Sequence, residues 1–277
     1  AQQQLGEAPC VFSWLAFGSQ ARMDQSLNAD QDNALLLEKE PSGAVADYFS
    51  ALADFVCQGL ARCGIPLCPG NIMATNPELR LSLKGWSGRF ARWIATPTPE
   101  ALLKASIFFD LRVIDGSKGL FNALQQDILQ RTSEAPLFLY HLAQAALQRT
   151  APLGLFKNFI LEQDGKHKKG LDLKKRGISL LTDLARVYAL SAGINDVNTR
   201  RRLQQLAAQG GGFTLHHATR SRERTPFVES LAKAGYASRV HHHFVALGRE
   251  PTHHRHHLSP RQACKARKRG ERGGGNA

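Results

Sequence analysis

The alternation of apolar and polar positions divides the beginning of the chain into two short strands with a polar stretch between them. The apolar runs from Val11 to Phe17 and from Ala34 to Leu37 have the length and composition of buried strands. Gly18-Ser19, directly after the first run, predicts a tight turn, and the residues that follow predict a polar helix. The pattern therefore predicts a strand, a turn, a short helix and a second strand.

Helical periodicity dominates the remainder, apart from one further strand from Ile107 to Val113. Apolar residues recur at helical spacing in the other segments. In the segment from Leu83 to Ile94, the aromatic residues Trp86, Phe90 and Trp93 are expected to pack in a core rather than to stack on bases. The predicted helices lie between Ser42 and Gly64, from Leu83 to Ile94, from Thr98 to Ala105, around Leu120 to Ile128, around Phe138 to Ala146, around Ile178 to Tyr188, and from Thr199 to Gly210.

Strands crowd the first third of the chain and helices fill the rest. This order predicts an α/β (α+β) core with a small mixed sheet, followed by an all-helical domain. We expect the core at residues 1–134, the helical domain at 135–212 and a tail at 213–277. The segment from Pro152 to Asp172 is expected to form a loop or a broken helix.

The composition is ordinary for a globular protein, with 43% hydrophobic and 21% charged residues among 277. No apolar run approaches the roughly 20 residues that span a bilayer, and residues 1–4 show no secretory signal. Five scattered cysteines without a CxxC pair favour a reducing cytoplasm over a disulfide framework. Because the sequence begins without methionine, we expect a fragment whose upstream sequence is missing.

The net charge of +13 is concentrated at the C-terminal end. Residues 1–199 carry 20 basic and 19 acidic residues, whereas residues 200–277 carry 16 and 4, together with nine of the eleven histidines. A near-neutral body with a basic tail differs from the face-wide basic footprint of a dedicated nucleic-acid reader. Binding to RNA or lipid is therefore expected only through the tail, and residues 264–277 are expected to be disordered or to reflect a disrupted reading frame.

Candidate chemistry gathers around the turn at Gly18-Ser19. Side chains alternate across a strand, so Asp30 and Asp32 point to the same face at the entry of the second strand. Two adjacent carboxylates repel each other unless a cation lies between them. Oxygen ligands favour a hard ion such as Mg²⁺, which commonly bridges carboxylates and substrate phosphates. The backbone amides after Ser19 are suited to bind those phosphates.

Asp110 interrupts the third predicted strand. A carboxylate in an apolar strand is costly unless it is paired or binds a metal. Two interpretations remain open, a structural pair with Arg112, two residues further along, or ligation of the same metal centre.

These residues resemble a known superfamily. Gly18-Ser19, Asp30-x-Asp32 and Asp110-Leu111-Arg112 resemble the signature of the DNA polymerase β-like nucleotidyltransferases. Several longer segments resemble one bacterial branch more closely. This branch is related to the N-terminal domain of the PII-protein uridylyltransferases, and its members are often fused behind CBS or cyclic-nucleotide-binding domains. The segments are Gly18 to Asn33, Cys68-Pro69-Gly70 to Asn76-Pro77, and Phe108 to Arg112, while Pro152 to Leu206 resembles the C-terminal helical domain of that branch.

The resemblance implies that residues 1–134 form a nucleotidyltransferase catalytic domain and that 135–212 form a substrate-binding-like helical domain. It implies two Mg²⁺ ions, an NTP substrate (UTP or ATP), a protein or small-molecule acceptor, and a role in cytoplasmic signal transduction. The implied catalytic residues and metal ligands are Asp30, Asp32 and Asp110. The implied nucleotide and phosphate contacts are Gly18, Ser19, Arg22, Gln25, Asn33 and Arg112.

Two departures from the family pattern are Ala21, where glycine is usual, and Asp24, where glutamate is usual. Ala21 is expected to tighten the turn near the phosphates. Three alternatives to an active enzyme remain, namely a catalytically silent nucleotide sensor, a nucleic-acid-binding protein that acts through its tail, and an antitoxin-like partner domain.

Overall fold

The computed structural model describes most of the first 209 residues. The described ranges are 1–26, 29–148, 162–164, 167–170 and 178–209. The tail predicted at 213–277 and most of the segment from Pro152 to Asp172 lie outside them. The expectations for these segments, including RNA or lipid binding by the tail, therefore stay predictions.

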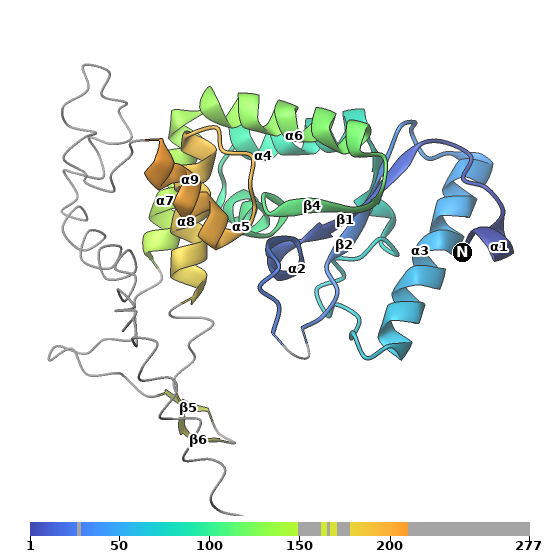
Figure 1. Cartoon of the computed structure of the whole chain (residues 1–277), viewed down its shortest axis with the longest axis horizontal. Coiled ribbons are helices and arrows are strands. Elements are labelled where there is room, and N and C mark those ends of the chain that lie inside the picture. The colour runs from blue at the N-terminus through green and yellow to red at the C-terminus, as the bar shows by residue number, and fades with distance from the viewer. Residues whose placement is uncertain (27–28, 149–161, 165–166, 171–177, 210–277) are drawn as a thin grey trace, which may run out of the picture.

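Four strands form a mixed sheet in the order β3-β2-β1-β4 (Figure 1). β1 runs antiparallel to both β2 and β4, and β3 runs parallel to β2. The strands are β1 (Phe12–Phe17), β2 (Asn33–Leu37), β3 (Arg80–Ser82) and β4 (Leu111–Gly116). The two apolar runs at the beginning of the chain are thus confirmed as strands, and the small mixed sheet is confirmed as well.

The predicted strand from Ile107 to Val113 is wrong in its first half. Ile107 and Phe108 belong to helix α5 (Pro99–Phe108), and β4 begins only at Leu111. Thr98 caps α5 by accepting the amide of Ala101. The helix continues beyond the predicted end because it buries its last turn, where Phe108 is 5% exposed.

Helices cover both faces of the sheet. The long helix α3 (Gly43–Arg62) packs on one face, where Phe49 and Leu52 contact the cluster that contains Trp14 and Leu35. The helices α4 (Leu83–Ala95), α5 and α6 (Lys118–Ser133) pack on the other face, as Figure 1 shows. The short helix α1 (Gln2–Leu5) lies beside α3, α2 (Gly18–Arg22) directly follows β1, and the 3₁₀ turn η1 (Pro77–Leu79) directly precedes β3.

The C-terminal described helices extend this arrangement. They are α7 (Pro136–Leu147), α8 (Ser179–Ser191) and α9 (Thr199–Ala208), and a separate two-stranded sheet pairs β5 (Glu162–Asp164) with β6 (His167–Gly170). α9 begins at Thr199, as the sequence predicts, and Asn198 caps it by accepting the amide of Arg201. Among the described helices, none combines the length and the apolarity that crossing a membrane requires.

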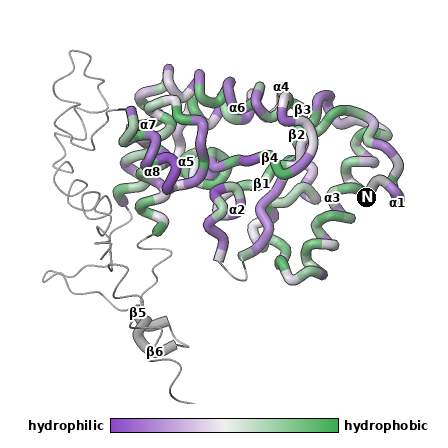
Figure 2. The backbone as a smooth tube through the Cα atoms, in the orientation of Figure 1, coloured by the Kyte–Doolittle hydropathy of each residue, from purple (hydrophilic) through white to green (hydrophobic). Residues whose placement is uncertain are grey.

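A single hydrophobic cluster joins the sheet to these C-terminal helices. It contains Phe17 and Leu111 from the sheet, Phe138 from α7 and Val187 from α8. The cluster therefore continues across the boundary that the sequence predicts between residues 134 and 135. Figure 2 shows that α2 and the loop after it consist largely of hydrophilic residues.

Trp86 lies at the centre of the core beneath the sheet. Its ring centroid is 5.9 Å from that of Phe17 and 6.0 Å from those of Phe90 and Phe108. Its indole N–H donates to the carbonyl of Leu35 at 3.0 Å. The prediction that the aromatic residues of α4 pack in a core is confirmed.

We expect Trp86→Phe to lower the free energy of unfolding by about 1–3 kcal/mol, because a buried carbonyl loses one of its donors and the core loses volume. Trp93→Phe is the matched control, since Trp93 is only partly buried. It should cost under about 1 kcal/mol. Urea denaturation followed by circular dichroism measures both, and equal losses for the two variants would contradict the central role of Trp86.

Candidate active site

Gly18 connects β1 to α2 in a conformation that favours glycine. Its φ is +55°, and a Cβ atom at this position would lie 3.6 Å from Oδ2 of Asp32. Its amide donates to the carbonyl of Asp110, while the amide of Phe17 donates to the carbonyl of Asp32, both at 3.0 Å. The end of β1 thus lies between the backbones of the two acidic segments that the sequence singled out.

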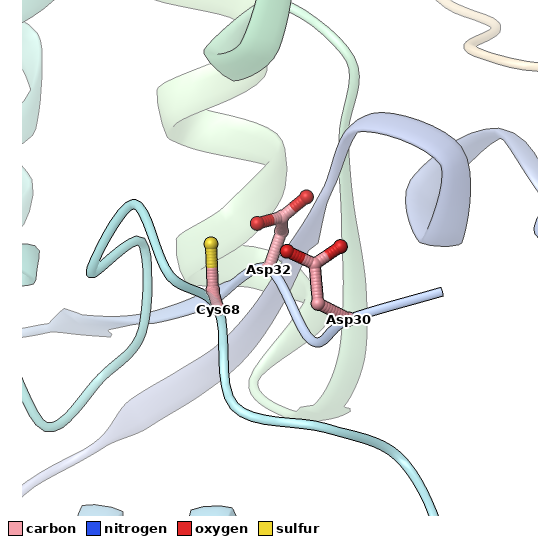
Figure 3. A group of neighbouring side chains, drawn as sticks. All are labelled: Asp30, Asp32 and Cys68. Carbon is pink, nitrogen blue, oxygen red and sulfur yellow. The ribbon is translucent and has the colours of Figure 1, made fainter. Parts of the chain in front are cut away.

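Asp30 and Asp32 come together with Cys68. One ligand atom from each of the three lies within 4.8 Å of the others, and Figure 3 shows the three side chains beside one another. Both carboxylates are half-buried, and Cys68 is buried. The structure therefore places the two predicted metal ligands side by side, next to the turn at Gly18.

Cys68 adds a thiol to this group. Its pKa is raised to about 11, mainly by burial, and the hydrogen bond with Asp32 contributes in the same direction. The thiol by itself is therefore protonated near neutral pH. The carboxylate oxygens of Asp30 and Asp32 are the donors in this group that fit a hard ion such as Mg²⁺.

Asp110 is held by three arginines. Its oxygens accept from Arg22 at 2.7 Å, from Arg186 at 2.6 Å and 3.0 Å, and from Arg202 at 2.6 Å. The carboxylate is fully buried, and the side chains of Arg186 and Arg202 are 2% exposed. The structure thus brings Asp30 and Asp32 together, but the group of metal-competent side chains found among the described residues does not include Asp110.

The three guanidinium groups determine the charge state of Asp110. Burial works to raise the pKa of this carboxyl, but the charges of Arg186, Arg202 and Arg22 outweigh it and hold the pKa well below its usual range. Asp110 is therefore ionised at every physiological pH.

The same network connects α2 to the C-terminal helices. Arg186 lies on α8 and also donates to Asp183 at 2.7 Å, and Arg202 lies on α9. Asn198, the cap of α9, donates to the carbonyl of Arg22 at 2.7 Å. The turn at Gly18-Ser19 is consequently fixed to elements that lie more than 150 residues further along the chain.

Arg112 supports the turn through hydrogen bonds to the backbone of α2. Its guanidinium donates to the carbonyls of Ala21 at 3.0 Å and Gln20 at 2.9 Å, so it satisfies carbonyls near the end of α2. The described contacts do not include the predicted structural pair of Asp110 and Arg112. Three other arginines hold Asp110, and Arg112 bonds to the backbone of α2 instead.

The remaining predicted contact residues lie in different surroundings. Ser19 and Arg22 line a cavity beside the turn, and Gln25 is exposed on the following loop. Asn33 is 1% exposed, and its side-chain oxygen accepts from the amide of Ala74 at 2.8 Å. Asn33 thus fixes a neighbouring loop, and a direct nucleotide contact by its side chain stays a prediction.

Sequence reasoning did not assign roles to Arg186, Arg202 and Cys68. Arg186 did leave a signal, because it lies in an apolar helical stripe three residues after Asp183, the spacing of an ion pair on a helix. A buried arginine of this kind needs an acid nearby. Sequence patterns cannot show that this acid is Asp110, because the tertiary fold brings the two residues together from positions 76 residues apart.

We expect Asp110→Asn to lower the free energy of unfolding by about 3–5 kcal/mol, because it leaves buried guanidinium groups without a counter-charge. Asp127→Asn is the control, since Asp127 pairs with Arg131 at a partly exposed site. Its cost should be about 0–1 kcal/mol. Chemical denaturation at pH 7 measures the difference, and similar losses would contradict a central role for the Asp110 cluster.

The stabilisation by Asp110 should also depend on pH. Because its folded-state pKa is depressed, its contribution is complete above the unfolded value of about 3.9 and is lost as the pH falls further. The gap in unfolding free energy between wild type and Asp110→Asn should therefore be constant from pH 7 to 5 and shrink below about pH 4. A gap that instead grows on acidification would contradict the depressed pKa.

Two family models match the chain. "Putative nucleotidyltransferase DUF294" matches residues 1–100, and "Putative nucleotidyltransferase substrate binding domain" matches residues 136–223. The first match contains Gly18, Asp30, Asp32 and Cys68, and Asp110 falls between the two matches. No curated protein and no solved structure matches the chain. The two matches together span about two thirds of the sequence and confirm the resemblance, and the chain belongs to the nucleotidyltransferase family described as DUF294.

Proposed function

We propose that this protein transfers an NMP group from an NTP to an acceptor hydroxyl. The observation that carries the proposal is the pair Asp30 and Asp32, whose side chains lie together beside the turn at Gly18. Acids beside a turn that carries a serine and an arginine are suited to bind a metal–triphosphate complex. Membership of a nucleotidyltransferase family supports the same reaction.

Asp30 and Asp32 would hold Mg²⁺, which their oxygen donors suit. When bound, the metal supplies neutralisation of the triphosphate charge and polarisation of the phosphoryl oxygens. A second metal ligated by Asp110 stays a prediction of the resemblance. Three guanidinium groups hold both oxygens of Asp110, and their positive charges oppose a nearby divalent cation.

Ser19 and Arg22 would bind the β- and γ-phosphates. Arg22 is half-buried, and Asp110 and Asp24 fix its guanidinium, so its position is set before the nucleotide arrives. Arg112 holds the carbonyls of α2 and keeps the turn in place. These residues orient the triphosphate, and orientation is the main contribution a protein makes to phosphoryl chemistry.

The reaction is a substitution at the α-phosphorus. The acceptor oxygen forms a bond to that phosphorus, the bond to the oxygen that bridges the α- and β-phosphates breaks, and pyrophosphate leaves with the electron pair. The proton of the acceptor hydroxyl passes to solvent. UTP and ATP are the candidate nucleotides, and a protein tyrosine or a small molecule is the candidate acceptor.

The resemblance to the PII-protein uridylyltransferases supports a place in cytoplasmic signal transduction, with CBS or cyclic-nucleotide-binding domains as candidate upstream partners. Catalysis would then answer to a signal that those domains bind. A second candidate function is a nucleotide sensor without turnover. The capture of Asp110 by three arginines favours it, because the acid predicted to complete the catalytic set is occupied.

The test is incubation with each α-³²P-labelled NTP, Mg²⁺ and a bacterial lysate. We expect label on protein or on a small molecule, and Asp30→Asn or Asp32→Asn should reduce the transfer at least about a hundredfold because the metal loses a ligand. Asp115→Asn, an exposed acid on the same sheet, is the matched control and should transfer at the wild-type rate.

Nucleotide binding without label transfer would select the sensor instead. If wild type neither binds nor transfers any NTP, both candidate functions fail. Transfer that survives Asp30→Asn and Asp32→Asn unchanged would show that the site lies elsewhere.

A further inference from the structure

The pair of acids at Asp30 and Asp32 shares its place with a sulfur atom that the proposed function does not use. One carboxylate oxygen of each acid and Sγ of Cys68 lie within 4.8 Å of one another. Figure 3 shows the ends of the three side chains directed to the same side. Cys68 is a free thiol, and both acids are only half-buried, so an ion can reach the group past the carboxylates.

Backbone hydrogen bonds hold Cys68 opposite Asp32. Cys68 lies in the cysteine loop, by which we mean residues 65–74. The two residues that flank Asp32 donate their amides to the carbonyls of Pro66 and Ile72, both at 3.0 Å. These carbonyls lie before and after Cys68 in the loop. The backbone around the acid is therefore joined to the backbone around the sulfur, and the fold itself determines that the two side chains meet.

Two buried side-chain amides strengthen this junction. Gln31 and Asn33 are 0% and 1% exposed. The amide nitrogen of Gln31 donates to the carbonyls of Cys57 at 3.0 Å and Ile65 at 3.2 Å. The side-chain oxygen of Asn33 accepts the amide of Ala74 at 2.8 Å. Both ends of the cysteine loop are thus fixed to the entry of β2, which keeps the sulfur in position before any ion binds.

The cysteine loop also supports a negative charge on the sulfur. Burial raises the pKa of Cys68, but the backbone amides of Ile72 and Gly70 hydrogen-bond to the sulfur and act in the opposite direction. These amides belong to the residues two and four positions after the cysteine. Hydrogen bonds of this kind stabilise a thiolate, and a bound metal ion replaces the thiol proton outright. The surroundings of Cys68 therefore fit a metal-bound thiolate.

The three donors differ in the metal ions that they suit. Mg²⁺ takes oxygen ligands, so the two carboxylates are the donors that serve it. Borderline ions such as Zn²⁺ and Co²⁺ take carboxylate oxygens and thiolate sulfur alike. Tetrahedral zinc needs oxygen and sulfur donors about 3.3–3.7 Å apart, which a small rotation of the half-buried carboxylates supplies from separations within 4.8 Å.

We propose that Cys68 is a third ligand of the metal centre at Asp30 and Asp32 and gives this centre a preference for borderline divalent ions such as Zn²⁺ and Co²⁺. The proposal rests on the proposed function, which assigns the two acids as metal ligands, and it adds the class of metal. When such an ion binds, the S–H bond of Cys68 breaks, the proton passes to solvent, and the sulfur donates its electron pair to the metal. With Mg²⁺ the sulfur stays a thiol, so the two classes of ion compete for one centre.

Cobalt reports directly on the sulfur. A thiolate bound to Co²⁺ gives a charge-transfer band in the near ultraviolet, which carboxylate and imidazole ligands do not give. We expect this band when the full chain is titrated with Co²⁺ in the absence of nucleotide. Cys68→Ser should abolish it, and Asp30→Asn or Asp32→Asn should raise the Co²⁺ concentration that it requires by about tenfold or more, because the ion loses a ligand.

Two other cysteines supply the controls. Cys63 is exposed directly after α3, and Cys264 follows the histidines of the tail in the sequence. Cys63→Ser and Cys264→Ser should both keep the band. A band that disappears with either of them and survives Cys68→Ser belongs to another site and overturns the proposal.

Isothermal titration then compares the ions. Zn²⁺ should bind Cys68→Ser about tenfold or more weakly than wild type, whereas the affinity for Mg²⁺ should be the same in both. The histidines of the chain also bind zinc, but they are identical in the two proteins and do not contribute to the difference. An equal loss of Mg²⁺ affinity would show that Cys68 only shapes the loop, and it would overturn the proposal.

The wild-type protein alone is enough to reject the proposal. If it gives no charge-transfer band with Co²⁺, Cys68 is not a ligand, whatever the variants do. Circular dichroism of Cys68→Ser verifies that a lost band does not reflect unfolding. A failure of the proposed function looks different, because wild type then shows the cobalt band but neither binds nor transfers any NTP.

Discussion

A single buried carboxylate holds together the parts of this molecule that form the site. Asp110 accepts hydrogen bonds from arginines on α2, α8 and α9, three elements that are distant in sequence. Removing a carboxylate and three guanidinium groups from water is costly, and the cost is offset only when their geometry brings all of them together. The position of the C-terminal helices relative to the sheet is therefore tied to this one contact.

The shape of the turn at Gly18-Ser19 depends on the same contact. The backbone of Asp110 accepts the amide of Gly18, its side chain fixes Arg22, and Asn198 from the cap of α9 holds the carbonyl of Arg22. A change in the helical segment would consequently alter the groups that are proposed to bind the triphosphate. The core and the helical segment thus build one site together, in line with the hydrophobic cluster that continues from the sheet into α7 and α8.

Sequence reasoning succeeded where structure depends on local spacing. The strands β1 and β2, most helices, and the proximity of Asp30 to Asp32 follow from periodicity and from the alternation of side chains along a strand. The surroundings of Asp110 do not, because its partners Arg186 and Arg202 lie 76 and 92 residues away. The strand boundary adds a second reason. Asp110 precedes β4, which begins at Leu111, so the alternation along the strand does not determine where its side chain points relative to Arg112.

The acids near the turn at Gly18-Ser19 differ in their partners. Asp30 and Asp32 group with the thiol of Cys68, and two adjacent carboxylates attract a cation. Asp24 and Asp183 instead pair with Arg22 and Arg186. The first two acids therefore suit a metal ion, whereas the other two position guanidinium groups, and one of these, Arg22, is the group proposed to bind the phosphates.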